Sequence, residues 1–268
     1  MGTTRGRLER GAVELHWWLT ADDPDAPLLI CTHGGAMDHR MWDAQVAALA
    51  KDYRILSHDL RGHGLSTCPA SRFSVDAACD DLVALMDTID AETAVLVGHS
   101  VGATVSQLVA LRHPHRVRAL VGIGAACVTI APTAAARVRQ AVNPLALRML
   151  GQKRIREMFA DMAGVTPEVE KYAREAIGSV ADDVFAAVMR TGFGCYQAVD
   201  EGYTLGVPLL LLQGDQEPYS AFMGTTPQWA KRDGAQLTIV PNAAHNANQD
   251  SPDFVNGEMA DFLTHVPA

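Results

Sequence analysis

Three residue types that together can activate a hydroxyl group occur along the chain in the order serine, acid and histidine: Ser100, Asp215 or Glu217, and His245. Ser100 lies in the motif G-H-S-V-G at 98–102, directly after a short apolar run and before a helical pattern. A glycine-flanked serine at such a strand-to-helix turn exposes its hydroxyl above the sheet. The hydroxyl becomes a nucleophile when a base accepts its proton and an acid orients that base. The pattern therefore predicts acyl transfer through Ser100.

The base and its acidic partner are expected on two loops near the end of the chain. His245 follows the last predicted strand, in a loop that would lie over the carboxyl edge of the sheet, where Ser100 also sits. Asp215 and Glu217 both follow the preceding strand and lie between Ser100 and His245 in the sequence, as the order serine, acid, histidine requires. Spacing alone does not choose between these two carboxylates.

Apolar runs and amphipathic stretches alternate along most of the chain, and they predict the elements that must position these residues. Predicted strands cover 27–32, 53–57, 93–97, 117–123, 207–213 and 236–240, and a predicted hairpin covers 6–10 and 12–19. Predicted helices cover 41–51, 75–89, 101–113 and 253–265. Continuous apolar runs are typical of strands buried on both faces of a parallel sheet. The alternation predicts a doubly wound α/β sheet.

The interval 126–205 interrupts this alternation with helical patterning and no convincing strand. We interpret it as a helical cap of about four helices inserted into an α/β core formed by 1–125 and 206–268. The apolar side chains of this predicted cap could form a roof over an apolar substrate, or they could simply pack within the protein. They include Leu145, Leu147, Met149, Leu150, Met158, Phe159 and Met162.

Composition excludes several classes of protein. The 268 residues are 48% apolar, which rules out a disordered chain and suits one large domain. The net charge of −9 argues against nucleic acid or an anionic membrane as a partner, and no apolar run reaches the roughly 18 residues of a membrane span. We expect no signal peptide, because residues 1–15 lack an apolar stretch. We also expect no disulfide framework or zinc site, because the five cysteines are odd in number and lack C-x-x-C spacing. A cytoplasmic location is the simplest expectation.

Four ordered motifs resemble those of the α/β-hydrolase family: H-G-G at 33–35, D-L-R-G-H-G-L-S at 59–66, the serine motif at 98–102 and a helical insertion at 126–205. The resemblance implies a mostly parallel, eight-stranded sheet with a helical cap. It also implies that the catalytic carboxylate stands three residues after Gly214, at Glu217 rather than Asp215. The following Pro218 and Tyr219 are similar to the sequence after the glutamate of acylhomoserine lactonases with this fold.

The resemblance implies a serine hydrolase that cleaves a small ester or lactone without a cofactor or a metal. Ser100 would be the nucleophile, His245 the base and Glu217 the group that orients His245. Two backbone N–H groups, those of Gly35 and Val101, would bind the negatively charged oxygen that develops during attack. Epoxide hydrolases and haloalkane dehalogenases of this fold carry aspartate where Ser100 stands, so these two activities are not expected.

Other chemistries have weaker support in the sequence. Five histidines lack the spacing of a metal-binding motif: His33, His39, His58, His63 and His99. Their neighbour Asp59 is better explained as the residue that fixes the turn containing Gly62 and Gly64. Gly122-x-Gly124 lacks the third glycine of a dinucleotide site. An esterase, a lactonase, a carbon–carbon bond hydrolase, a perhydrolase and a non-catalytic binding protein stay open, and the oligomeric state is not predicted.

Overall fold

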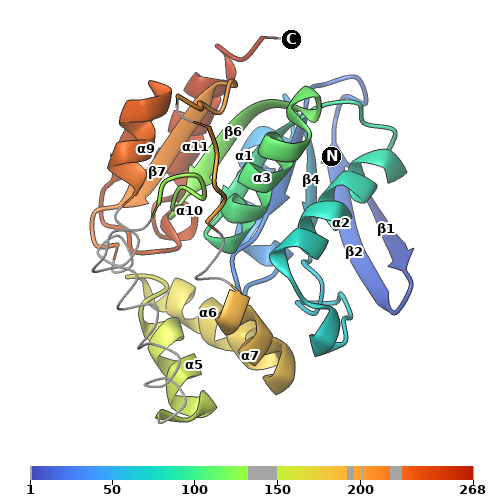
Figure 1. The fold of residues 1–268 in the computed structure, drawn as a ribbon, viewed down its shortest axis with the longest axis vertical. Coiled ribbons are helices and arrows are strands. Elements are labelled where there is room, and N and C mark those ends of the chain that lie inside the picture. The colour runs from blue at the N-terminus through green and yellow to red at the C-terminus, as the bar shows by residue number, and fades with distance from the viewer. Residues whose placement is uncertain (1, 132–149, 192–195, 201, 218–224, 268) are drawn as a thin grey trace.

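A computed structural model describes residues 2–131, 150–191, 196–200, 202–217 and 225–267 (Figure 1). These residues form one eight-stranded sheet in the order β1-β2-β4-β3-β5-β6-β7-β8. Strand β2 runs antiparallel to its neighbours β1 and β4, and the other neighbouring pairs are parallel. The predicted fold class, a mostly parallel eight-stranded α/β sheet, is confirmed. The strands are β1 (Gly2–Arg10), β2 (Val13–Ala21), β3 (Leu28–Thr32), β4 (Arg54–His58), β5 (Ala94–His99), β6 (Val117–Ile123), β7 (Leu209–Gly214) and β8 (Gln236–Val240).

The central strands owe their position to their side chains. Every residue of β3 and β5 is buried, which a run of leucine, isoleucine and valine permits on both faces of a sheet. Strand β8 lies at the edge, and its residues are mostly exposed or half-buried. The sheet therefore presents its most apolar strands in the middle, where the serine motif follows β5.

Helices cover both faces of the sheet (Figure 1). Helices α2 (Val75–Thr88), α3 (Val101–Arg112) and α9 (Thr226–Asp233) pack on one face, and α1 (Asp43–Leu49) and α11 (Pro252–Leu263) pack on the other. The helix predicted over 41–51 is shorter than expected, because a 3₁₀ turn at His39–Trp42 precedes α1. Helix α9 and the short α10 (Ala247–Asp250) were not predicted from the sequence, because neither contains enough apolar residues to show a helical period.

Three described helices fall between β6 and β7 in the sequence: α5 (Gln152–Asp161), α6 (Pro167–Ser179) and α7 (Asp182–Thr191). We call them the α5–α7 segment, and Figure 1 shows them grouped at one end of the sheet. Helix α6 begins where the Thr166 hydroxyl accepts a hydrogen bond from the N–H of Val169, with Pro167 in the first turn. The remainder of the predicted cap, including Leu145, Leu147 and Met149, lies partly outside the described residues.

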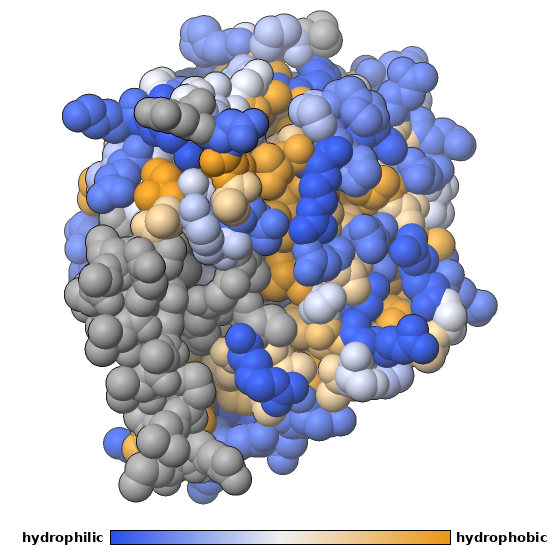
Figure 2. Space-filling view, in the orientation of Figure 1, coloured by the Kyte–Doolittle hydropathy of each residue, from blue (hydrophilic) through white to orange (hydrophobic). Residues whose placement is uncertain are grey.

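The exterior seen in Figure 2 is hydrophilic around the periphery of the face that carries α2 and α3, with apolar residues toward its middle. Within the described ranges, no helix combines the length and the hydropathy that crossing a lipid bilayer requires.

Candidate active site

Ser100 occupies the turn between β5 and α3 in a strained backbone conformation, with φ 51° and ψ −113°. Its N–H donates to the carbonyl oxygen of Ile123 at 2.9 Å, which fixes the turn against β6. The flanking glycines allow the close approach of helix and strand. A Cβ atom on Gly102 would lie 2.0 Å from the Thr32 oxygen, and one on Gly98 would lie 2.5 Å from the first turn of α3. The strain thus persists because the surrounding backbone enforces it.

The His245 imidazole pairs with the Glu217 carboxylate. Its Nδ1 lies 2.9 Å from Oε2 and 3.1 Å from Oε1. Because an ionised carboxylate only accepts hydrogen bonds, Nδ1 carries the proton and Nε2 is left as the basic nitrogen. The side chains of His245 and Glu217 are 13% and 3% exposed, so water competes little for this contact.

Asp215 contacts the backbone of the histidine loop instead of the imidazole. Its carboxylate accepts hydrogen bonds from the N–H groups of Ala243 and Asn242, each at 3.1 Å. These donors hold the pKa of Asp215 below its ordinary value. The structure therefore distinguishes the two carboxylates, which sequence spacing could not do. Glu217 contacts the imidazole of His245, and Asp215 contacts the backbone. Pro218 and Tyr219 lie outside the described residues.

Ser100 and His245 line one cavity together with Gly35 and Val101. The Ser100 hydroxyl makes no hydrogen bond to another described residue. This is common in enzymes without substrate, because catalytic hydrogen bonds often form only when substrate is bound. The other described lining residues are mostly apolar: Ala36, Met37, His99, Thr104, Gly124, Ala126, Phe159, Ala163, Ile177, Val188 and Met189. Of the cap side chains singled out in the sequence, Phe159 lines the cavity, whereas Leu150 is 51% exposed and does not.

Gly35 and Val101, whose N–H groups are the predicted anion-binding donors, both line this cavity. Neither N–H donates to an acceptor within the described part of the chain. Val101 is the first residue of α3, where the N–H is unpaired by the helix itself and the helix dipole favours negative charge. The two residues adjoin, since a Cβ atom on Gly35 would lie 3.1 Å from Cγ2 of Val101.

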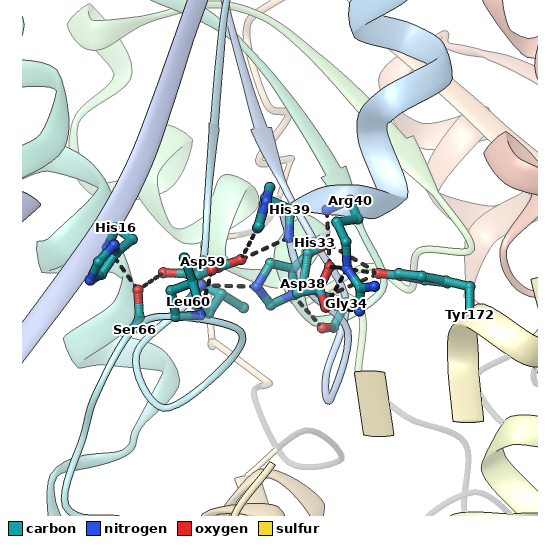
Figure 3. Close-up of polar contacts among 11 residues, drawn as sticks. His16, His33, Gly34, Asp38, His39, Arg40, Asp59, Leu60, Ser66 and Tyr172 are labelled. Carbon is teal, nitrogen blue, oxygen red and sulfur yellow. Dashed lines mark hydrogen bonds and ion pairs between the residues drawn. The ribbon is translucent and has the colours of Figure 1, made fainter. Parts of the chain in front are cut away.

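His33 orients the peptide that carries the Gly35 N–H (Figure 3). Its Nε2 accepts a hydrogen bond from the Leu60 N–H at 2.9 Å, so its Nδ1 is protonated and donates to the Gly34 carbonyl at 2.7 Å. Burial, helped by the neighbouring His63, lowers the pKa of His33 to about 3 and keeps the ring neutral. The Gly34 carbonyl and the Gly35 N–H belong to one peptide group, which His33 therefore holds in place.

Asp59 joins the loop that follows the H-G-G motif to the 59–66 turn (Figure 3). Its carboxylate accepts from the N–H and the Nδ1–H of His39, both at 2.8 Å, and from the N–H of Leu65 at 2.7 Å. Burial opposes ionisation, but these hydrogen bonds, chiefly that of His39, leave the pKa of Asp59 below its ordinary value. The expectation that Asp59 fixes the turn is confirmed, and the same carboxylate also anchors the loop that follows Gly35.

Contacts with the α5–α7 segment add residues that sequence analysis missed. The Tyr172 hydroxyl on α6 accepts from the Asp38 N–H and donates to the Asp38 carbonyl, both at 3.1 Å (Figure 3). The Arg40 guanidinium pairs with the Asp38 carboxylate and lies 5.3 Å from the centre of the Tyr172 ring. On the other side of the site, the Asn246 N–H donates to the Ala163 carbonyl at 2.7 Å. The segment is thus tied to both loops that flank the cavity.

Two further residues, His99 and Gly124, lie against His245. The His99 Nε2–H donates to the His245 carbonyl at 3.0 Å, and the two rings lie 4.5 Å apart. Gly124 has φ 54°, and a Cβ atom there would lie 2.9 Å from Nδ1 of His245. From the sequence, Gly124 is interpreted only as part of an incomplete dinucleotide motif; its position directly after the predicted strand 117–123 could have indicated a close contact.

Besides His33, the buried histidines His58 and His99 serve as neutral hydrogen-bonding groups. Burial lowers the pKa of His58 to about 4, and burial with the proximity of His245 lowers that of His99. Within the described ranges, no three metal-ligating side chains cluster in a way that could hold a metal ion.

Comparisons with known proteins identify the family to which the chain belongs. The model of the alpha/beta hydrolase fold family matches residues 27–252. The chain belongs to the alpha/beta hydrolase fold family. It is similar to 3-oxoadipate enol-lactonase 2 of Acinetobacter baylyi, with 25% identity over 89% of each chain. It is also similar to epoxide hydrolase A of Mycobacterium tuberculosis, with 27% identity over 91% of this chain and 92% of that protein.

Solved structures show the same fold. A thermophilic esterase from Thermogutta terrifontis has a TM-score of 0.78 and 23% identity, covering 99% of this chain and 100% of the other. The alpha/beta hydrolases similar to this one thus include an epoxide hydrolase, an enol-lactonase and an esterase.

Gly35→Ala tests the close packing at the Gly35 N–H. A Cβ atom there would lie 2.9 Å from Cγ1 of Val188 as well as 3.1 Å from Val101, so the loop must shift. Misplacing one such donor is expected to lower kcat by about 10²-fold. Steady-state hydrolysis of an ester substrate measures this, with Gly257→Ala on α11 as a control that meets no neighbour. Adding Val188→Ala should restore part of the activity, and a full loss in the double variant would contradict the packing argument.

Proposed function

We propose that this alpha/beta hydrolase is a serine hydrolase that cleaves a carboxylic ester or lactone of a small, largely apolar substrate through an acyl-enzyme on Ser100. The observation that carries the proposal is the His245–Glu217 pair at 2.9 Å, beside the same cavity as the strained Ser100. No cofactor and no metal enters the proposed reaction.

In the first half of the reaction, Oγ of Ser100 attacks the substrate carbonyl carbon while Nε2 of His245 accepts the hydroxyl proton. Glu217 keeps the imidazole in the required tautomer and stabilises the imidazolium that forms. The carbonyl oxygen becomes negatively charged and receives hydrogen bonds from the N–H groups of Gly35 and Val101. His245 then gives its proton to the departing alkoxide, which leaves as an alcohol.

In the second half, water attacks the acyl-enzyme and the same groups repeat their roles. Nε2 of His245 accepts a proton from the water, the two N–H groups bind the second oxyanion, and Ser100 leaves with the proton returned by His245. The acid product is released with the enzyme regenerated. For a lactone, the alcohol and the acid are the two ends of one product molecule.

The nucleophile also separates this proposal from epoxide hydrolysis, the activity named for one similar protein. A serine oxygen that opened an epoxide would form an ether, which water does not cleave under mild conditions, and turnover would stop. A carboxylate nucleophile forms an ester that water can hydrolyse. The Ser100 hydroxyl therefore suits substrates with a carbonyl group.

A panel of substrates tests the proposal. We expect wild-type protein to hydrolyse short p-nitrophenyl esters, unsubstituted lactones or both, with Ser100→Ala as the inactive control. Faster turnover of lactones than of linear esters would define a lactonase, the class to which one similar protein belongs by name. Tight binding of these compounds without product release would instead favour a binding protein and contradict the proposal.

A further inference from the structure

We propose that Thr104 is a specificity-determining residue, whose hydroxyl binds a neutral hydrogen-bond acceptor on the acyl or ring part of the substrate. The inference rests on the proposed hydrolase function and concerns the same cavity. Thr104 lies on α3 four residues after Ser100, one helical turn and roughly 6 Å along the axis from the nucleophile. It lines the cavity and is half-buried.

The Thr104 hydroxyl is available because it does not follow the usual pattern of hydroxyls on helices. Serine and threonine hydroxyls often donate to the carbonyl four residues before them. Ser106, two residues further along α3, donates to Gly102 at 2.9 Å, and Thr88 on α2 donates to Ala84 at 2.7 Å. The Thr104 hydroxyl makes no hydrogen bond with any residue that the structure describes. A substrate atom in the cavity can therefore use it.

The remaining lining limits what that substrate atom can be. Apart from Thr104, the polar side chains among the described lining residues are Ser100 and His245, which the reaction uses, and His99, which donates to the His245 carbonyl. The described lining contains no lysine or arginine, so a carboxylate in the cavity would have no cationic partner among the described lining residues. An uncharged acceptor such as an ether, ketone or amide oxygen fits a single hydroxyl in these surroundings.

A cycle of variants and matched esters tests the role of Thr104. The esters are p-nitrophenyl hexanoate and its three analogues in which an ether oxygen replaces the methylene group at carbon 3, 4 or 5. The variants are Thr104→Val, which keeps the shape and removes the hydroxyl, and Thr104→Ser, which keeps the hydroxyl. Comparing each variant with wild type on all four esters cancels their different intrinsic reactivities. Ser106→Ala is the control on the same helix.

Thr104→Val should lower kcat/KM for at least one ether analogue by about 3- to 10-fold, since a hydrogen bond to a neutral group is lost. The same variant should raise kcat/KM for the hexanoate by about twofold, because its chain then packs against a methyl group. Thr104→Ser should retain the preference of wild type, and Ser106→Ala should leave the ratios between esters unchanged.

Three results would overturn the inference in distinguishable ways. Equal factors on all four esters in Thr104→Val would show that the hydroxyl does not select the substrate. Labelling of Ser100 by a fluorophosphonate without hydrolysis of any of the four esters would overturn the role of Thr104 in selecting acyl chains and leave the proposed serine hydrolase, including a lactonase, intact. If the protein shows neither labelling by the fluorophosphonate nor hydrolysis of any ester, the proposed function is overturned. The role of Thr104 is then overturned as well.

Discussion

Replacing Ser100 with alanine is expected to lower kcat by about 10⁴- to 10⁶-fold, because the proposed mechanism loses the Oγ atom that attacks the substrate carbonyl carbon. The residual rate would come from the N–H groups of Gly35 and Val101, which still bind the developing oxyanion. KM should change much less than kcat, because the cavity walls are unaltered. Initial-rate measurements on a p-nitrophenyl ester over a range of concentrations would separate the two parameters.

The matched control is Ser106→Ala on the same helix. The Ser106 hydroxyl is buried and donates to the Gly102 carbonyl, so its removal should affect stability slightly and leave kcat close to that of wild type. Equal activity of Ser100→Ala and wild type, in samples free of other esterases, would refute the role assigned to Ser100.

The second large effect is expected at Glu217. Glu217→Gln keeps the shape of the side chain but removes the negative charge that stabilises the imidazolium of His245, and the amide can present its NH₂ group to Nδ1 and favour the wrong tautomer. We expect kcat to fall by about 10³-fold or more, with a smaller change in KM. Progress curves at saturating substrate would measure the decrease.

Asp215→Asn is the control for Glu217→Gln. Asp215 is exposed and bonds to the backbone N–H groups of Asn242 and Ala243, so its substitution should loosen the histidine loop and lower kcat by about tenfold or less. The reverse ranking, full activity in Glu217→Gln and near-complete loss in Asp215→Asn, would exchange the roles of the two carboxylates.

The sheet was the most predictable part of the molecule. Strands β6 and β8 agree with the predicted ranges 117–123 and 236–240 at both ends, because each apolar run is as long as the strand that it forms. Helix α9 was missed because only Thr226, Trp229 and Ala230 of its eight residues are buried, too few to show a 3.6-residue period.

Of the predicted site residues, Ser100, His245, Gly35 and Val101 line one cavity and Glu217 pairs with His245. The contacts that support them could not be predicted from local sequence. The contact between Tyr172 and Asp38 joins residues that are 134 positions apart. No local spacing encodes such a contact, since it depends on how the α5–α7 segment lies against the sheet. The choice between Asp215 and Glu217 likewise needed either the family resemblance or the directions of the two side chains.

An amphipathic helix also hides which of its apolar residues reach a cavity. On α5, Phe159 lines the cavity while its neighbour Met158 is half-buried elsewhere. Both belong to the same apolar pattern in the sequence, and a rotation of the helix by one position would exchange them. The pattern could therefore predict an apolar roof without identifying its members.

Intact-mass spectrometry after incubation with a fluorophosphonate tests the central claim most directly, because the reagent bonds to a serine whose hydroxyl is activated. We expect one adduct on the wild-type protein and none on folded Ser100→Ala. The absence of an adduct on folded wild-type protein, or an adduct of equal yield on Ser100→Ala, would contradict this claim.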